Sequence, residues 1–206
     1  HRGPHPDDPK LFNAETLPSL RAAVRDLSYL SGHAYAVDSA LKVVGDRYQL
    51  RARQRSAVMR SACANERAAA RAARRLAPEA LRGQTLCLDG FNVLTSLEVA
   101  LSGGVVLIGR DGVLRDIAEC EWYFDQPVSN SGRLSARVRA LAEQAGLPWA
   151  ASVVMNPDRV LLESEHVVAS ADAQILDGPV RWTNLARTVV ERRVPEAYLI
   201  DLSRDV

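Results

Sequence analysis

Cysteine is scarce in this sequence, with only three in 206 residues, and Cys63, Cys87 and Cys120 lie far apart. No CxxC pair and no cluster of cysteine and histidine occurs, so neither a zinc site nor a disulfide framework is indicated. The longest apolar runs, such as Val105–Ile108, are far too short to span a bilayer, and no secretory signal peptide is recognisable at the start. We therefore expect a protein of the reducing cytoplasm with no membrane partner.

Several catalytic signatures are also missing from the sequence. It has no P-loop, no GxGxxG segment and no HExxH segment. His33 and His166 are isolated and have no partnered nucleophile, so a Ser/His or Cys/His mechanism has no support.

The net charge of +1 hides an uneven distribution of arginine. Ten arginines and two glutamates fall between Arg47 and Arg82. The stretch Gln49–Arg82 is rich in alanine and arginine and lacks glycine, which predicts a long helix. Its arginines either form a solvated face over apolar neighbours or form a surface for phosphates, in which Arg51 and Arg55 would contact the substrate. The charge pattern alone favours neither interpretation.

The spacing of apolar residues divides the chain into three parts. Residues 1–16, rich in proline, aspartate and histidine, are typical of a flexible or wrapping arm. Helical periodicity then predicts a helix that begins at Leu17 and is stopped by Ser31-Gly32, and a second helix over 36–48. We expect a helical, arginine-rich domain over 17–82 and an α/β domain over 84–206.

After Gly83 the pattern changes to short strands that alternate with helices. We expect strands at 85–88, 104–108, 113–117, 121–124, 151–155, 166–169 and 197–200, and helices after Leu134 and over Trp182–Arg193. Arg110-Asp111-Gly112 predicts a hairpin, because Asp-Gly tolerates the positive φ of a tight turn. The alternation favours a three-layer α/β fold, a mostly parallel sheet with helices on both faces.

An aspartate stands at or near the end of three expected strands: Asp89, Asp125 and Asp172. One such aspartate is usually a turn former or a helix cap. In an open parallel sheet, however, ligands bind beyond the carboxyl ends of the strands. Three carboxylates gathered there would repel one another unless a divalent cation lay among them, and oxygen ligands suit Mg²⁺ or Mn²⁺. Such a metal ion can activate water and polarise a phosphoryl oxygen, as phosphodiester hydrolysis requires.

Two segments resemble motifs of a known superfamily. LCLDGFNVL (86–94) resembles the first strand and turn of PIN-like nucleases, especially the NYN branch, and VVASADAQILD (167–177) resembles their apolar strand followed by Thr/Ser-x-Asp. Nearly the whole chain also resembles a little-characterised prokaryotic group, whose helical N-terminal part is catalogued as domain of unknown function 434 and whose C-terminal part is PIN-like. The residues that carry this second resemblance are Ala40–Leu50, Asp89–Leu94, Gly109–Gly112 with Arg115-Asp116, and Pro127–Leu134.

The resemblance implies a PIN/Rossmann-like fold and a nuclease that uses Mg or Mn to hydrolyse phosphodiester bonds, of RNA over DNA. Asp89 and Asp172 would be metal-binding acids, and Asn92 would orient the carboxylate or the substrate. Asp177 would be a secondary metal ligand, and Ser170 would cap a helix or touch phosphate. The middle acid would be Asp125, which rests on its place at a strand end, since no motif marks it.

The segment PVSNSG (127–132) leaves two interpretations open. Ser129, Asn130 and Ser131 either cradle a phosphate at a helix N-terminus or cap that helix. Asp111 and Asp116 are expected to have structural roles beside the hairpin. Two rival functions therefore remain: a non-catalytic PIN-like module that binds RNA or a protein, and a Rossmann-like domain that binds a nucleotide. Homo-oligomers are compatible with all of these.

Overall fold

The computed structural model of the chain describes residues 3–117, 131–155 and 166–204. Near the N-terminus it contains helices α2 (Leu17–Gly32), α3 (Val37–Arg47) and α4 (Ala52–Ser61). Their apolar faces form one buried core, which includes Leu27, Val44 and Val58. The prediction of a helical N-terminal region is confirmed. None of the helices in the described part of the chain combines the length and apolar character needed to cross a bilayer.

The residues expected to form an arm hold a short helix, α1 (Asp8–Leu11). Phe12 follows it and is buried in the same core as α2–α4. Asp8 is buried as well and forms an ion pair with Arg53 of α4, with 2.6 Å between Asp8 Oδ1 and Arg53 Nε. The described residues of this segment are thus fastened to α4 by both apolar and charged contacts.

The prediction of one long arginine-rich helix over Gln49–Arg82 is wrong. Helix α4 ends at Ser61, α5 covers Asn65–Ala73, and a two-residue strand β1 (Arg75–Leu76) and a 3₁₀ turn η1 (Pro78–Leu81) follow. The break has a tertiary cause: the backbone N–H of Cys63 donates to Ser28 Oγ at 3.0 Å, and Arg110 donates its backbone N–H to the carbonyl of Ser61 at 2.9 Å. Helix propensity is overridden because these partners take the backbone groups that a continuous helix would use.

A five-stranded parallel sheet has the order β1-β7-β6-β2-β5. Its remaining strands are β2 (Thr85–Leu88), β5 (Ser152–Met155), β6 (Val167–Ala169) and β7 (Arg181–Thr183). The expectation of a mostly parallel sheet is confirmed. The helix expected over Trp182–Arg193 begins only at Leu185, as α10 (Leu185–Arg193), because the preceding residues pair with β6 and β1.

Side chains alternate between the two faces of this sheet. Leu86 and Leu88 point to the core shared with α6 (Gly90–Leu101), α7 (Ser131–Gln144) and α10. Cys87 and Trp182 face the opposite side, where Leu176 of α9 (Ala173–Asp177) packs against them. Helices therefore cover both faces, and β1 joins the sheet from the segment that the sequence assigned to the helical domain.

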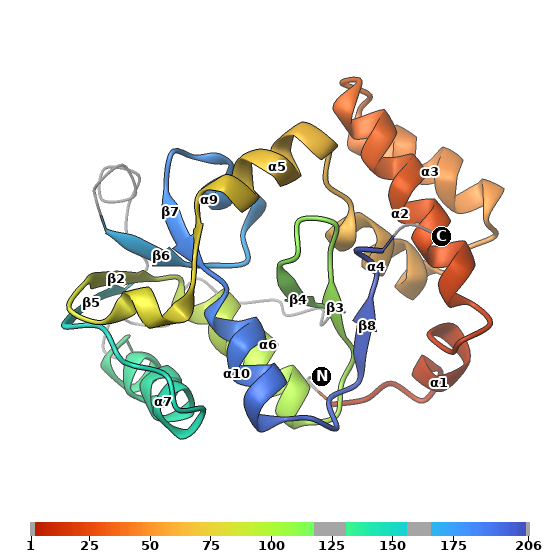
Figure 1. Cartoon of the computed structure of the whole chain (residues 1–206). Helices are drawn as coiled ribbons and strands as arrows, with labels where there is room; N and C mark the ends of the chain where they lie inside the picture. The colour runs from red at the N-terminus through yellow and green to blue at the C-terminus, as the bar shows by residue number, and fades with distance from the viewer. Residues whose placement is uncertain (1–2, 118–130, 156–165, 205–206) are drawn as a thin grey trace.

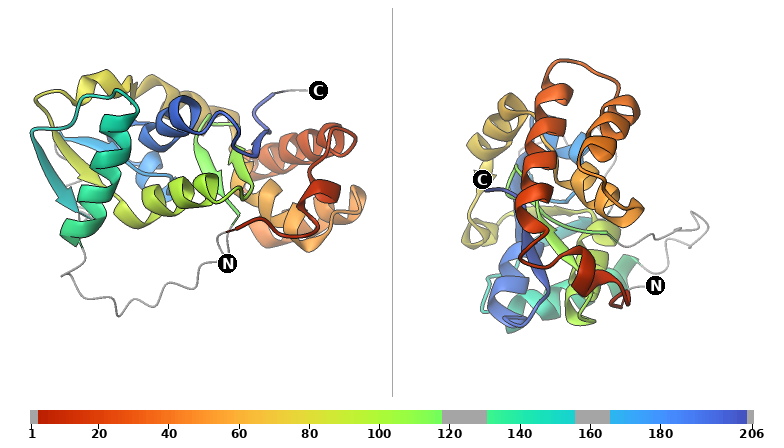
Figure 2. Two further views of the ribbon diagram at one scale, coloured as in Figure 1. Left: turned by 90° about the horizontal axis from the view of Figure 1, so that it is seen from below. Right: turned by 90° about the vertical axis from the view of Figure 1, so that its right-hand side faces the viewer.

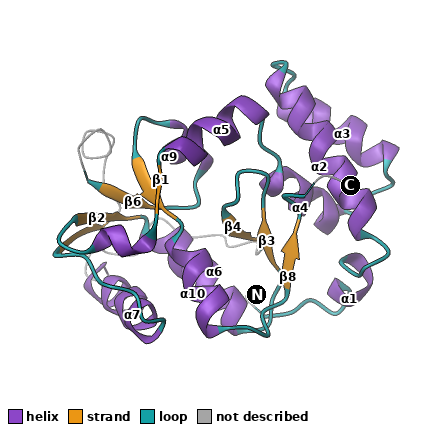
Figure 3. Cartoon of the chain, in the orientation of Figure 1, coloured by secondary structure: helices purple, strands orange, loops and turns teal. Residues whose placement is uncertain are grey.

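A second, three-stranded sheet connects the two ends of the molecule. Strands β3 (Val106–Ile108) and β4 (Leu114–Asp116) form the expected antiparallel hairpin, with Gly112 at φ +74°, and β8 (Leu199–Asp201) pairs parallel to β3. Figure 1 shows helices α1–α4 at one end, the five-stranded sheet at the other and this small sheet between them, and Figure 3 shows the same layout by element type. The left view in Figure 2 shows the resulting elongated shape.

Candidate functional site

Asp89 lies at the junction of β2 and α6. Its backbone N–H donates to the carbonyl of Ala169 at 3.0 Å, which continues the parallel pairing of β2 with β6. Its Oδ2 atom accepts hydrogen bonds from Asn92 Nδ2 at 2.7 Å and from Ser170 Oγ at 2.6 Å. Asn92 reaches back because it stands three residues further on, in the first turn of α6, where side chains at this spacing are neighbours. Asn92 therefore has the geometry that an orienting residue requires.

Asp172 is connected to Asp89 through Ser170. The Ser170 hydroxyl donates to Asp89 and accepts from the backbone N–H of Asp172 at 2.9 Å. Asp172 is also the N-cap of α9, where its Oδ1 accepts from the backbone N–H groups of Gln174 at 2.6 Å and Ile175 at 3.3 Å. One of its carboxylate oxygens thus has the capping role common for aspartate, while Oδ2 has no partner within the described residues.

Among the described residues, no protein cation balances the charges of these two carboxylates. Their partners are a hydroxyl, a side-chain amide and backbone N–H groups, all of them neutral. Within the described ranges, no lysine or arginine lies at ion-pair distance from Asp89 or Asp172. The two negative charges follow the ends of adjacent parallel strands and repel each other, with no counter-charge from the described residues.

A cavity of about 360 Å³ opens beside these residues. The helical part contributes to its wall, and so do α6, β4 and the loop that begins α9. The residues that line it are Met59, Arg60, Ala62, Arg71, Asn92, Ser96, Arg115, Asp116, Ala171, Asp172, Ala173 and Gln174. The site is therefore shared between the two parts of the chain that the sequence distinguishes.

Asp116 is a further acid on this wall that the sequence interpretation treated as structural. It is buried, accepts a hydrogen bond from Ser96 Oγ at 2.8 Å, and lies 3.9 Å from Arg60 Nη1. Asp116 was missed because ligand sites are expected at the carboxyl ends of parallel strands, whereas Asp116 ends a strand of an antiparallel hairpin. The sequence signal that could have pointed to Asp116 as a site residue is its place in Arg115-Asp116, one of the segments that carry the family resemblance.

An ion-pair cluster centred on the buried residues Asp111 and Arg71 lies against the same cavity. Asp111 accepts hydrogen bonds from Arg115, at 2.9 Å to Oδ1 and 2.7 Å to Oδ2, and a further one from Arg71 Nη1 to Oδ2. Arg71 also donates from Nε and Nη2 to Asp177 Oδ1 at 2.8 and 2.6 Å. We call these four residues, Arg71, Asp111, Arg115 and Asp177, the arginine clasp.

Burial and ion pairing act in opposite directions on Asp111. Burial alone would raise the pKa of its carboxyl, but the hydrogen bonds from Arg115 and the charges of Arg115 and Arg71 outweigh burial, so that the pKa lies below its ordinary value. Burial also acts to lower the pKa of Arg71, and its acidic neighbours reverse that effect and raise it. Asp111 and Arg71 are therefore both ionised throughout the neutral range.

Asp177, expected to be a secondary metal ligand, belongs to this clasp. Besides Arg71, it has Arg67 Nη1 at 3.6 Å from its Oδ2. Its charge is thus balanced by two arginines, in contrast to Asp89 and Asp172. In the structure it helps to anchor the C-terminal end of α9.

Some of the expected site residues cannot be placed. Asp125, Ser129 and Asn130 lie outside the described residues, and so does the side chain of Ser131, the first residue of α7. The interpretations of PVSNSG and of Asp125 as the middle acid therefore stay predictions.

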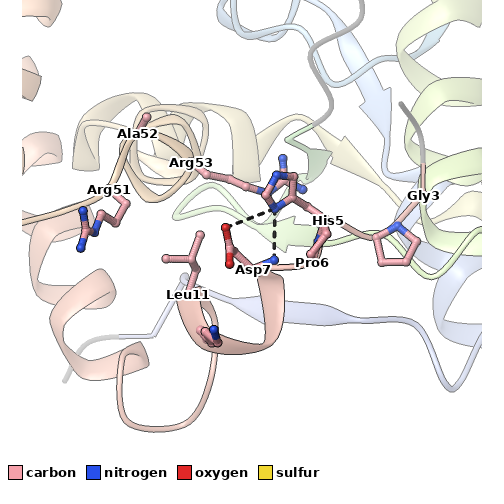
Figure 4. Close-up of a pocket in the computed structure, with 10 residues that line it drawn as sticks. Gly3, His5, Pro6, Asp7, Leu11, Arg51, Ala52 and Arg53 are labelled. Carbon is pink, nitrogen blue, oxygen red and sulfur yellow. Dashed lines mark hydrogen bonds and ion pairs between the residues drawn. The ribbon is translucent and has the colours of Figure 1, made fainter.

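Arg51 and Arg55 lie away from the cavity that Asp172 lines. Arg55 pairs with Asp46, with 2.8 Å from Nη2 to Oδ1, and donates from Nε to the carbonyl of Leu50 at 3.0 Å. Arg51 lines a different cavity of about 820 Å³, between the N-terminal segment and α4. Figure 4 shows Arg51 at one side of that cavity and His5 bonded to Asp7 at the other.

The atoms at this site that could coordinate a metal ion are oxygen atoms, which Mg²⁺ and Mn²⁺ prefer as ligands. They comprise the two carboxylates and the side-chain oxygen of Asn92, whose nitrogen already donates to Asp89. Within the described part of the chain, no three histidine, cysteine, aspartate or glutamate side chains converge closely enough to hold a metal ion. A metal ion here would therefore take further ligands from water or from other residues.

Two family models match different parts of the chain, and one relative aligns with most of it. Residues 78–121 and 117–188 match a family model described as "Domain of unknown function (DUF5616)", and residues 19–74 match one described as "Protein of unknown function (DUF434)". The chain is 25% identical over 186 residues to "Uncharacterized protein MJ0935" of Methanocaldococcus jannaschii, an alignment that covers 77% of this chain and 89% of that protein. No solved structure matches the chain significantly.

Proposed function

The chain belongs to the family described as Domain of unknown function (DUF5616), and we propose that it is a metal-dependent nuclease with a PIN-like α/β domain. It hydrolyses phosphodiester bonds, of RNA over DNA, with Mg²⁺ or Mn²⁺ held by carboxylates. The parallel sheet with β2 between β5 and β6 supports this fold assignment, because it brings the DGFN and SxD segments to neighbouring strand ends. The preference for RNA rests on the resemblance of these two segments to NYN-type nucleases.

One observation carries the proposal. Asp89 and Asp172, from segments more than 80 residues apart, are joined through the hydroxyl of Ser170 and have no cationic partner among the described residues. Isolated turn formers or helix caps do not require such a link, and two uncompensated carboxylates cost free energy unless a cation neutralises them. A divalent cation supplies the missing charge.

The donor set fits such an ion. Asp89 and Asp172 Oδ2 would bind it, and Asn92 would bind it or orient Asp89. Asp116 lines the same cavity and is a candidate third acid beside Asp125. When bound, a metal ion lowers the pKa of an attacking water and polarises the phosphoryl oxygen.

The cavity wall supplies a positive charge for substrate. Arg60 of α4 lines it with two fifths of its side chain exposed, 40%, so its guanidinium can meet a phosphate oxygen from solvent. Arg71 is buried and Arg115 is mostly buried, and both are engaged with Asp111. Arg60 also lies 3.9 Å from Asp116 Oδ1, so it would contact a substrate phosphate while it remains paired with Asp116. Arg51 and Arg55 would contact only a longer strand.

The experiment is cleavage of a 5′-labelled single-stranded RNA by the purified full chain with Mn²⁺, Mg²⁺ or EDTA. Asp89→Asn, which keeps the side-chain shape, should abolish metal-dependent cleavage, and Asp38→Asn, an exposed position in the first turn of α3, should leave it unchanged. DNA of the same sequence should be cut more slowly. No metal-dependent cleavage by the wild type, or equal cleavage by Asp89→Asn, would refute the proposal.

A non-catalytic RNA-binding module is the second candidate. It is favoured by the capping role of Asp172 and by the lack of three converging ligands among the described residues. In that case the protein would retain the same labelled RNA in EDTA and in Mn²⁺ alike, and no product would form. The cleavage assay therefore separates the two candidates directly.

A further inference from the structure

We propose that Arg71 and Arg115 are positioning residues that fix Asp172 in its metal-binding orientation, with buried Asp111 as the anchor that holds both arginines. The inference rests on the proposed function only in assigning Asp172 to the metal. The placing of Asp172 by the arginine clasp is a separate claim, with a separate measurement.

The two arginines hold the backbone on either side of Asp172. Arg115 Nε donates to the carbonyl of Ala171 at 3.1 Å, and Arg71 Nη2 donates to the carbonyl of Ala173 at 3.2 Å. Both guanidinium groups are bound at the same time to Asp111. One buried carboxylate thus fixes the positions of the residues before and after Asp172.

Helix α9 needs this support because it has only five residues. Isolated helices of that length are not stable in water, since nucleation costs more than a few hydrogen bonds return. Arg71 binds α9 at both ends, through the Ala173 carbonyl and the Asp177 carboxylate. The direction of Asp172 as the N-cap of α9 is therefore set by the clasp.

Arginine is required for this geometry. Each guanidinium makes hydrogen bonds in several fixed directions, toward a carboxylate and a carbonyl together, whereas a lysine ammonium is a compact point charge. Arg71 comes from the helical part and Arg115 from the hairpin of the small sheet. The helical part therefore acts on the site through the backbone that carries Asp172.

The test compares Arg115→Lys and Arg71→Lys with Arg139→Lys, which alters an exposed pair with Glu143. The first measurement is hydrogen exchange of the Gln174 and Ile175 amides, the groups that Asp172 Oδ1 accepts. We expect faster exchange at these amides in both clasp variants and no change in Arg139→Lys. This readout requires no metal ion and no substrate.

The second measurement is the Mn²⁺ dissociation constant, which should rise about 10- to 100-fold in the clasp variants, as for other residues that orient metal ligands. In an Asp172→Asn background, Arg115→Lys should have no further effect on Mn²⁺ binding, because its route to the metal is gone. Each variant is assayed well below its melting temperature, so that global unfolding does not contribute.

The outcomes separate the two proposals. If the amides of Gln174 and Ile175 keep wild-type protection in both clasp variants, the positioning role is refuted, even if the melting temperature falls. If those amides exchange faster but the wild type binds no Mn²⁺, the positioning role stands and the nuclease proposal falls. An effect of Arg115→Lys on Mn²⁺ affinity that persists in Asp172→Asn would also overturn the inference, because it would show a route other than Asp172.

Discussion

Two pairs of aspartates lie near one cavity and differ in how their charge is balanced. Asp111 and Asp177 are bound by arginines, in contacts that are largely buried for Asp111 and Arg71. Asp89 and Asp172 have neutral hydrogen-bond donors and no such arginine among the described residues. Composition and spacing do not distinguish these pairs, since all four are aspartates near strand or helix ends.

The difference assigns the two pairs to different tasks. Removing one member from a buried carboxylate with two arginines destabilises the folded chain, because it leaves uncompensated charge behind. Asp89 and Asp172, which have no cationic partner among the described residues, are costly to the fold until a cation binds. The arginines of the helical part, considered at first as a phosphate surface, are in several cases engaged internally, with Asp8, Asp46, Asp111 or Asp177.

The largest effect is expected when the clasp loses its acid. Asp111→Ala should lower the free energy of unfolding by about 3–5 kcal/mol, because it leaves Arg71 and Arg115 buried without their partner. Asp89→Asn should change it by less than about 1 kcal/mol, since only hydrogen bonds to neutral groups are altered. Urea unfolding of both variants measures the contrast. Equal losses would erase the distinction between the two pairs.

Stabilisation by a metal ion should depend on Asp89, the residue whose substitution alone has the smaller effect on unfolding. Mn²⁺ at a hundred times its dissociation constant should stabilise the wild type by about 2.7 kcal/mol. Asp89→Asn should lose most of this gain, while Arg139→Lys should keep it. The measurement is the shift of the melting temperature as Mn²⁺ is titrated, relative to the melting temperature in the same buffer without a metal ion. An equal shift in Asp89→Asn would remove Asp89 from the metal site.

The sequence predicted the elements that depend on local signals. The hairpin at Asp111-Gly112, strands β2, β5 and β6, and helices α2 and α3 follow from apolar periodicity and turn residues, and the structure contains them. The alternation of strands and helices predicted a mostly parallel sheet, but not which strands are neighbours. The pairing of β2 with β6, on which the juxtaposition of Asp89 and Asp172 depends, comes from the structure.

What the sequence could not predict depends on long-range contacts. Ser28 and Arg110 interrupt the arginine-rich helix through backbone hydrogen bonds that no local pattern encodes. The same holds for the ion pairs of Arg71, whose partners lie 40 and 106 residues away. An arginine count predicts charge, but only the tertiary structure determines which arginines are used internally.

Acid should weaken the clasp more gradually than a substitution does. Because the pKa of Asp111 is lowered in the folded state, its stabilising contribution is complete above its unfolded pKa, about 3.9, and is lost as the pH falls through the lower folded value. The stability difference between wild type and Asp111→Asn should therefore be constant at neutral pH and shrink below about pH 4. Urea unfolding from pH 7 to pH 3 measures it, and a difference that grew toward acid would reverse the assigned direction.

The smallest effect tests the two roles of Asp172 against each other. Asp172→Ala removes the N-cap of α9 and should cost about 1 kcal/mol. Asp172→Ser should recover most of that stability, because serine is also a favourable N-cap, yet it has no carboxylate for a cation. If Asp172 serves only as a cap, Asp172→Ser behaves as wild type in both stability and Mn²⁺ binding. If it is also a metal ligand, urea unfolding of Asp172→Ser resembles the wild type while Mn²⁺ no longer raises its melting temperature.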